Sequence, residues 1–568
     1  MNIEVYKLKD QLTNPFFFFR IACLPFKMGD RARQGQYQMF SQYSTGHNQF
    51  RQYGSKSNIN LLVVCVLVLG VILTGLNIYQ LDRIKMDHST HMAELARIPE
   101  VEARNFDQTT NSSPIVWIQG GPRYKNNGPT GFLKHIFRVF DKMGFDVGDR
   151  SSDWAVMWSH DYPFGIYAAE MRSLQLHQKV NHFPGSGFIT NKVNLAQTQL
   201  SFIPKAFEIP RKKKEFLAYV GKHKNTSWVQ KSNQHRGIKI KTVDEVDLSK
   251  EGTFVQEYIS RPFLIDGRKF DIGVYTIVTS VDPLRVYTID GDALFRFCPQ
   301  EYYPFDRANL DKYVVGDNYR PMWKQPSFED LYVDHKFSFK NSFDEYLRQK
   351  GKDSKSMWSS IKSAIREVFL AKEKDIVKSL QKYRSKRNFF EMVRFDFVID
   401  EHLNVFLMEA NMSPNLSSDH FPPNERLYEH VIFNLLNLVG VAYYTSTNDQ
   451  KASSSNEAMR VSIQDIHVFP DFCNRQICSK DCEKTICKLC RNCLSPNFEL
   501  DLKYAYLEHM SRGSARRTFP PPITHAEATR FVLKKSSKLS FLAGLNLKNQ
   551  LMYLWFIGKC RLDESWCN

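Results

Sequence analysis

Acidic and amide side chains follow two short apolar runs in the stretch EMVRFDFVIDEHLNVFLMEANMSPNLSS, residues 391–418. The apolar runs and the polar tract between them predict a strand over residues 395–399, a tight turn, and a returning strand over residues 405–408. Such a hairpin brings the polar positions of both strands towards one edge. Those positions are Asp396, Glu409 and Asn411.

These three side chains suit a hard cation. Mg²⁺ prefers oxygen ligands and usually binds through one or two protein carboxylates together with substrate phosphates. The hairpin therefore predicts a magnesium site beside a nucleotide. The alternative is a surface hairpin with solvated acids, and the hairpin alone does not exclude it.

A lysine-bearing segment upstream favours the nucleotide site. In SWVQKSNQHRGIKI, residues 227–240, Lys231 ends a strand-like run and a polar loop with Arg236 and Gly237 follows. A lysine beside a flexible loop can neutralise phosphates, and glycine lets the backbone approach closely. The loop is neither a Walker loop nor a dinucleotide fingerprint.

Residues 253–297 carry further polar groups on predicted strands. The strand over residues 254–259 would present the backbone around Gln256, Glu257 and Tyr258 to an adenine edge. Lys269 and Asp271 lie two apart on the next strand, so they share a face, and a structural salt bridge is the alternative to a catalytic role.

The dipeptide Asp290-Gly291 predicts a hairpin turn, which returns Arg296 towards the same sheet.

The length and the net charge of the chain limit its possible domain organisation and partners. The chain has 568 residues, too many for one core, and a formal net charge of +17, which favours an acidic partner. No run of basic residues interleaved with aromatics resembles a nucleic-acid module, so we expect no nucleic-acid partner.

An uncharged stretch precedes the main body. The run INLLVVCVLVLGVILTGLNI begins at Ile59 and has the roughly 20 apolar residues that cross a bilayer, so the sequence predicts a single-pass transmembrane helix over residues 59–79. The flanking charges nearly balance, and only the wider tail favours a cytoplasmic N-terminus. The orientation stays open.

The chain has 11 cysteines. Six of them cluster, and they would form three disulfides in an oxidising compartment or bind zinc in a reducing one. Both interpretations stay open. The six are Cys473, Cys478, Cys482, Cys487, Cys490 and Cys493.

The apolar pattern predicts an amphipathic helix stopped by Gly144 and a second helix between residues 354 and 386. The expected organisation is a polar N-terminal tail without a stable fold (1–58), the transmembrane helix (59–79), a stalk (80–114), a globular body (115–445), a linker with the cysteine tract (446–500) and a basic C-terminal tail (501–568).

The order of the motifs resembles that of the tubulin–tyrosine ligase-like family of ATP-grasp amino-acid ligases. The resemblance covers residues 115–444 and rests on WSHDYPF, KVNHFPGSGFITNKVNL, WVQKSNQHRGI, VQEYISRPFLIDGRKFDIGVY and FDFVIDEHLNVFLMEANMSPNLS. It implies an α+β ATP-grasp fold that holds ATP between two α+β subdomains. It also implies that ATP converts a carboxylate to an acyl phosphate, which an amine attacks to form an amide.

The resemblance assigns roles by motif position. It implies ATP phosphate contacts at Lys231 and Lys269, and an adenine hinge at Gln256, Glu257, Tyr258 and Ile259. Further positions assigned to nucleotide binding are Arg236, Gly237, Asp271 and Asn411. The implied Mg²⁺ ligands are Asp396, Glu409 and Asn411, and the implied catalytic residues are Lys269, Asp271, Glu409 and Arg296, the last holding the reacting phosphate or the acceptor carboxylate.

One position departs from the family pattern. An arginine follows Lys-Phe-Asp-Ile in the family, and here that residue is Gly273. Losing a guanidinium that stabilises the anionic intermediate would cost about 3 kcal/mol or more. Arginine restored at Gly273 is therefore expected to recover activity if the missing side chain limits ligation.

Two functional hypotheses follow. The first is a membrane-anchored ligase that uses ATP and free glutamate to glutamylate acidic tubulin tails. The second is a catalytically impaired ATP-grasp scaffold that binds nucleotide or microtubules. The amino acid added, the acceptor and the oligomeric state stay open.

Overall fold

The computed structural model divides the chain into two units, residues 1–109 and 110–568. It describes residues 70, 73–76, 78–80, 82, 113–120, 128–224, 226–232, 238–442, 460–475, 478, 482–531 and 538–568.

The first unit contains the predicted membrane segment, most of which falls outside the described residues. The described positions within residues 70–82 are helical. Among the residues that the structure describes, no helix combines the length and the apolar character needed to cross a membrane. The predicted tail and nearly all of the predicted stalk also lie outside those residues.

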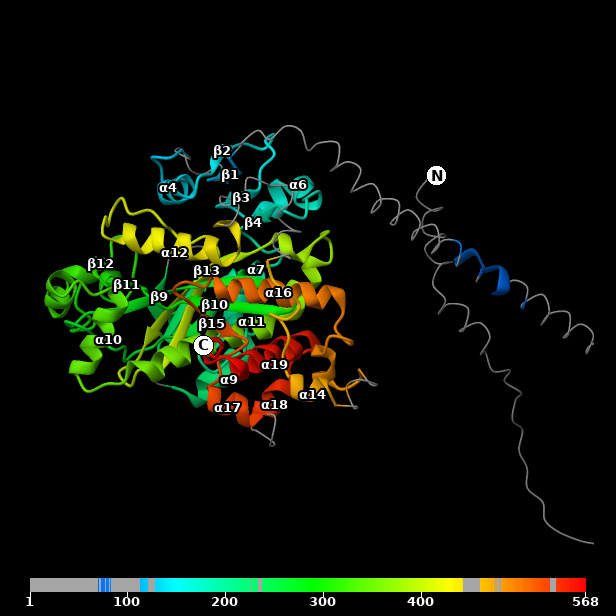
Figure 1. Cartoon of the computed structure of the whole chain (residues 1–568). Coiled ribbons are helices and arrows are strands. Elements are labelled where there is room, and N and C mark those ends of the chain that lie inside the picture. Colours follow the sequence, from blue (N-terminus) through cyan, green and yellow to red (C-terminus); the bar gives the residue numbers. More distant parts are fainter. Residues whose placement is uncertain are drawn as a thin grey trace, which may run out of the picture. The chain divides into compact units, whose positions relative to one another are not determined.

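The second unit begins with a small parallel sheet in the order β2-β1-β3-β4 (Figure 1). Helix α4 (Lys134–Lys142) follows β1, and Gly144 at φ 79° ends the turn after it, as the sequence predicts. The strands are β1 (Ile115–Gln119), β2 (Asp146–Gly148), β3 (Val156–Ser159) and β4 (Lys179–Val180).

The short helices α5 and α6 lie between β3 and β4, and α7 and α8 connect β4 to an antiparallel sheet in the order β5-β8-β6-β7. Helix α9 (Lys213–Lys222) covers the second sheet, and Phe216 from α9 packs edge-on against Trp228 to form a small separate core. The elements are α5 (Pro163–Ile166), α6 (Ala168–Arg172), α7 (Gly187–Thr190), α8 (Lys192–Ala196), β5 (Ala206–Ile209), β6 (Trp228–Ser232), β7 (Lys239–Lys241) and β8 (Thr253–Glu257).

The central sheet is built around the long strand β9 (Phe270–Val281). Strand β13 pairs antiparallel with one edge of β9, and β10 and β11 pair with successive parts of the other edge. The remaining strands are β10 (Leu284–Ile289), β11 (Leu294–Phe297), β12 (Arg320–Pro321), β13 (Glu391–Ile399), β14 (Val405–Asn411) and β15 (Ala515–Phe519).

The prediction of a hairpin at Asp290-Gly291 is wrong in its pairing. The turn does return Arg296 to the sheet, but β10 and β11 are not neighbours, because each pairs with β9. A two-residue turn signal is local, whereas strand partners depend on the whole sheet.

Helices pack on the central sheet, and nearly all of β9 and β13 is buried. Helix α12 contacts both α4 and β9, and it lies between the small parallel sheet and the central sheet in Figure 1. The Asp353 carboxylate caps the start of α11, which ends before the predicted limit. These helices are α10 (Phe339–Gln349), α11 (Ser354–Leu380) and α12 (Asn424–Leu438).

The segment expected to be a basic tail contains helices and a strand. Strand β15 joins the central sheet beside β10, and α19 is buried along most of its length in a second apolar core. The helices of this extension are α14 (Pro470–Cys473), α16 (Pro496–Met510), α17 (His525–Phe531), α18 (Lys538–Ala543) and α19 (Leu547–Leu562).

All six clustered cysteines form disulfides, so the structure favours the disulfide interpretation over zinc. In the described part of the chain, no group of three or more His, Cys, Asp or Glu side chains could hold a metal ion. The pairs are Cys473–Cys490, Cys478–Cys487 and Cys482–Cys493.

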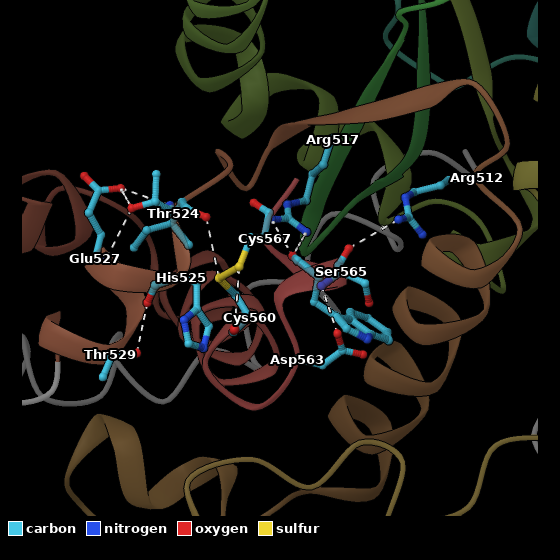
Figure 2. The surroundings of a disulfide bond; sticks show 12 residues. Arg512, Arg517, Thr524, His525, Glu527, Thr529, Cys560, Asp563, Ser565 and Cys567 are labelled. Atoms are coloured by element: carbon cyan, nitrogen blue, oxygen red, sulfur yellow. Dashed lines mark hydrogen bonds between the residues drawn. A yellow bond between two sulfur atoms is a disulfide. The ribbon is translucent and has the colours of Figure 1, made fainter.

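A fourth disulfide, Cys560–Cys567, ties the end of the chain to α19 (Figure 2). The Arg517 guanidinium from β15 donates to the carbonyl of Trp566 at 3.3 Å and to that of Cys567 at 3.4 Å. The C-terminus is therefore fixed to the central sheet by hydrogen bonds and to α19 by a covalent bond.

Candidate active site

The predicted metal hairpin is present, with strands longer than expected. Asp396 on β13 lies opposite Glu409 on β14, and Leu403 at φ 63° closes the turn. The Asn411 amide nitrogen donates to Asp396 Oδ2 at 3.1 Å and to Glu409 Oε1 at 3.2 Å. The structure therefore brings the three predicted magnesium ligands together.

Two arginines hold Asp396, whose side chain is only 2% exposed. Arg394 donates from Nε to Asp396 Oδ1 at 2.6 Å and from Nη2 to Oδ2 at 2.8 Å. Arg296 donates from Nη2 to Asp396 Oδ2 at 3.0 Å. Arg394 was not predicted as a site residue, although a basic residue inside the mostly apolar strand EMVRFDFVI is a signal that could have found it.

Arg296 also makes a two-point contact with Asp271. The two residues face each other across β11 and β9, and Nε and Nη2 of Arg296 donate to Oδ1 and Oδ2 of Asp271 at 2.9 and 2.8 Å. Burial raises the pKa of Asp271 above its ordinary value, while Arg296 opposes that shift. The planar fork fixes the orientation of the guanidinium.

Lys269 does not form the salt bridge with Asp271 that was considered as its structural alternative. Its Nζ donates to the carbonyl oxygen of Tyr313 at 2.9 Å and lies 5.0 Å from the centre of the Tyr258 ring. Burial lowers the pKa of Lys269. The Lys269 ammonium group therefore contacts a carbonyl oxygen and an aromatic ring. Among the described residues, no carboxylate accepts a hydrogen bond from it.

Lys231 extends from the neighbouring antiparallel sheet. Its Nζ donates to Gln256 Oε1 at 2.9 Å, and burial lowers its pKa to about 8. The charges of Glu409, Lys192 and Lys269 also act on it, so Lys231 lies near the hairpin acids and the second lysine. The other two predicted loop contacts, Arg236 and Gly237, lie outside the described residues.

The predicted adenine hinge, Gln256 to Ile259, begins in the last two residues of β8 and continues past its end. The backbone N–H groups of Glu257 and Tyr258 donate to the carbonyls of Lys205 and Ser227 at 2.8 and 2.9 Å. These two N–H groups already donate hydrogen bonds within the protein. An adenine would therefore have to form its hydrogen bonds with other backbone atoms between Gln256 and Ile259.

Lys192, at the start of α8, is a site residue that the sequence analysis missed. Its Nζ lies 2.6 Å from Glu409 Oε2. Burial alone would raise the pKa of Glu409, but Lys192 and the Asn411 amide outweigh burial and hold that pKa well below its ordinary value. The residue lies within the motif KVNHFPGSGFITNKVNL, which could have identified it.

The donor set fits a magnesium ion. Two carboxylates and one amide converge, and the Glu409 side chain is 25% exposed whereas that of Asp396 is 2% exposed. Asn411 is half-buried. Glu409 is therefore more accessible than Asp396, which forms the buried base of the set.

Comparisons with known proteins agree with this site. The sequence model of the tubulin-tyrosine ligase family matches residues 169–451. The chain is 40% identical over 479 residues to the Caenorhabditis elegans protein named probable tubulin polyglutamylase ttll-15, covering 82% of this chain and 90% of that protein.

Two mammalian relatives match over shorter parts. The mouse protein named tubulin monoglutamylase TTLL4 is 30% identical over 340 residues, which are 56% of this chain and 28% of the mouse protein. The human protein named tubulin polyglutamylase TTLL7 is 29% identical over 308 residues, which are 50% of this chain and 34% of the human protein. The chain belongs to the tubulin-tyrosine ligase family and is an ATP-dependent ligase.

Proposed function

We propose that the protein attaches glutamate to a glutamate side chain in the acidic tail of tubulin. The observation that carries this proposal is the convergence of the Asp396, Glu409 and Asn411 set with Arg296 and with Lys231, which come from different strands. The names of the relatives and the net charge of +17 agree with an acidic acceptor.

The proposed reaction has two balanced steps. A carboxylate oxygen of the acceptor attacks the γ-phosphorus of ATP, and the bond to the ADP oxygen breaks. The amine nitrogen of free glutamate then attacks the acyl carbon, phosphate leaves with the carboxylate oxygen, and the amine loses a proton. A bound magnesium ion would offset negative charge on the phosphates.

The residues of the chain act by charge and orientation. Lys231 and Lys269 would neutralise phosphate oxygens, and Glu409 with Asn411 would hold Mg²⁺. Arg296, fixed by Asp271, would place a planar guanidinium at the reacting phosphoryl or carboxylate group.

The test uses the purified full chain with ATP, Mg²⁺, labelled glutamate and tubulin. We expect label in tubulin and loss of the label in Glu409→Gln. The matched control is Glu401→Gln, which changes an acid in the turn of the same hairpin, paired there with Arg261. Nucleotide binding without incorporation by the unaltered chain would contradict tubulin as the acceptor.

As the alternative, we propose that residues 59–79 anchor the chain in a membrane, with the ligase body in an oxidising compartment. The four disulfides support this placement, because such bonds persist mainly in secreted, lumenal and extracellular proteins. They favour a second candidate function, in which the acceptor is an acidic polypeptide of that compartment rather than cytosolic tubulin.

The sequon Asn225-Thr226-Ser227 tests the placement. In cells, a glycosidase-sensitive mass that disappears in Asn225→Gln would support the oxidising side and the second acceptor class. A chain without such a mass, whose cysteines react with alkylating reagents without prior reduction, would favour a cytosolic body and tubulin.

A further inference from the structure

The glycine at position 273 lies on the same face of β9 as Asp271, beside Arg394 and Asp396. Asp271 and Gly273 lie two apart on one strand, so they share a face, and Gly273 lies opposite Asp396 on β13. The family arginine at this position would extend from β9 over the same face. The sequence alone suggests that its guanidinium is missing.

The space above Gly273 is filled by Arg394. A Cβ atom built on Gly273 would lie 2.9 Å from Arg394 Cδ and 3.3 Å from Arg394 Nε, closer than real Cβ contacts allow without movement. The same Cβ would lie 3.3 Å from Asp396 Oδ1. The side chain of Arg394 therefore crosses the position from which the family arginine would start.

Arg394 lies two residues before Asp396 on β13, diagonal to Gly273 across the strand pair. Its bidentate contact holds the Asp396 carboxylate from one side, while Arg296 reaches the same carboxylate from β11. Both arginines are largely buried. Each arginine is paired with a carboxylate. A buried Asp396 without such a partner would be costly, and the two positive charges prevent this.

We propose that Arg394 replaces the family arginine, so that the guanidinium is supplied from β13 instead of β9. This inference rests on the proposed ligase function of the same site. Arg394 acts as a positioning residue, because it orients Asp396 at the base of the metal set and adds positive charge where the phosphoryl group transfers. Gly273 is the matching change that makes room for it.

The proposal reverses the expectation from the sequence. Arginine added at Gly273 alone would collide with the Arg394 side chain and displace it from Asp396, so it would not recover activity. Moving the arginine from one strand to the other requires both changes, Gly273→Arg and Arg394→Gly, in one chain.

The test compares four variants of the full chain: Arg394→Gly, Arg394→Lys, Gly273→Arg and the double exchange. We expect Arg394→Gly and Gly273→Arg to lose about 100-fold or more in kcat. We expect Arg394→Lys to recover part of this loss, because it keeps the charge without the planar fork. The double exchange should return to within about tenfold of the unaltered chain.

A buried arginine outside the site gives the matched control. Arg285→Met removes a bidentate pair with Glu508 of similar burial and geometry, so it should lower Tm without changing the kcat of the folded protein. If the activity of Arg394→Gly falls only because less of the protein is folded, and kcat per folded molecule is unchanged, then Arg394 has a merely structural role. That result would overturn the proposal. A folded double exchange that is as inactive as Arg394→Gly would also overturn it.

A second readout, the binding of MgATP, distinguishes failure of the proposed function from failure of the proposal for Arg394. If the unaltered chain transfers no glutamate to tubulin, the variants are ranked by the increase in Tm that MgATP produces. An increase in Tm that is retained in the double exchange and lost in both Arg394→Gly and Gly273→Arg supports the replacement. Equal shifts in all four variants would overturn it.

Discussion

Arg285 and Glu508 form a buried bidentate ion pair between the central sheet and α16. Nε and Nη2 of Arg285 donate to Oε2 and Oε1 of Glu508 at 2.8 and 2.9 Å, and the Tyr287 hydroxyl donates to the same carboxylate at 3.1 Å. The C-terminal extension is therefore part of the folded ligase body, although the family match ends at residue 451.

Glu508→Gln should lower the free energy of unfolding by about 3–5 kcal/mol, because removing one partner leaves a buried charge without compensation. The measurement is thermal or urea unfolding of the full chain, with the exposed-acid change Glu564→Gln as control. A loss below about 1 kcal/mol would contradict a structural role for this pair.

Truncation after residue 445 should yield an insoluble or unfolded chain. It removes Glu508 and strand β15, which opens the edge of β10 and exposes the Arg285 side chain. The check is soluble yield and circular dichroism of the truncated and full chains. A soluble truncated chain with an unchanged Tm would show that the ligase body folds without the extension.

Replacing Arg296 by lysine should lower kcat about 10- to 100-fold with a smaller effect on KM for ATP, because lysine cannot form the two-point contact with Asp271. Steady-state incorporation of labelled glutamate measures both constants. Arg268→Lys is the control, since Arg268 donates only to backbone carbonyls of Cys298 and Pro299 among its hydrogen bonds in the described residues. Equal kcat values for both variants would exclude a specific role for the fork.

The ratio kcat/KM for ATP should fall as pH rises through about 8. Burial lowers the pKa of Lys231 to about 8, so the free enzyme loses the phosphate-binding charge above that pH. Lys231→Arg keeps its charge and should flatten the profile.

Deprotonation of Lys231 should not lower the free energy of unfolding. Lysine in the unfolded chain titrates near 10.5, so between pH 8 and 10.5 the unfolded state binds more protons, and the contribution of Lys231 to stability rises with pH. Thermal unfolding in the assay buffers separates the two effects. An unchanged pH profile in Lys231→Arg would assign the fall to another group.

Removing the Cys473–Cys490 disulfide by Cys473→Ser/Cys490→Ser should cost about 3 kcal/mol, the value expected for a loop of roughly 15 residues. Unfolding with and without reductant measures the loss. Cys298→Ala is the control, because Cys298 is the free cysteine among the described residues. A Tm that does not respond to reductant would contradict the disulfide assignment.

The local chemistry of the site follows from the sequence. The motif order identified an ATP-grasp ligase, and the hairpin that carries Asp396, Glu409 and Asn411 was predicted because strands and turns follow short-range patterns. Gly273 was visible as a departure because the flanking motif Lys-Phe-Asp-Ile fixes its position.

Tertiary structure alone decided what fills the space above Gly273. Arg394 is distant from Gly273 in the chain, and only the register of β13 on β9 places its side chain there. The same holds for Arg285 with Glu508 and for the cysteine pairs, because partners between distant segments depend on how the whole chain packs. The acids of the site are therefore visible in the sequence, and the fold determines which cations balance them.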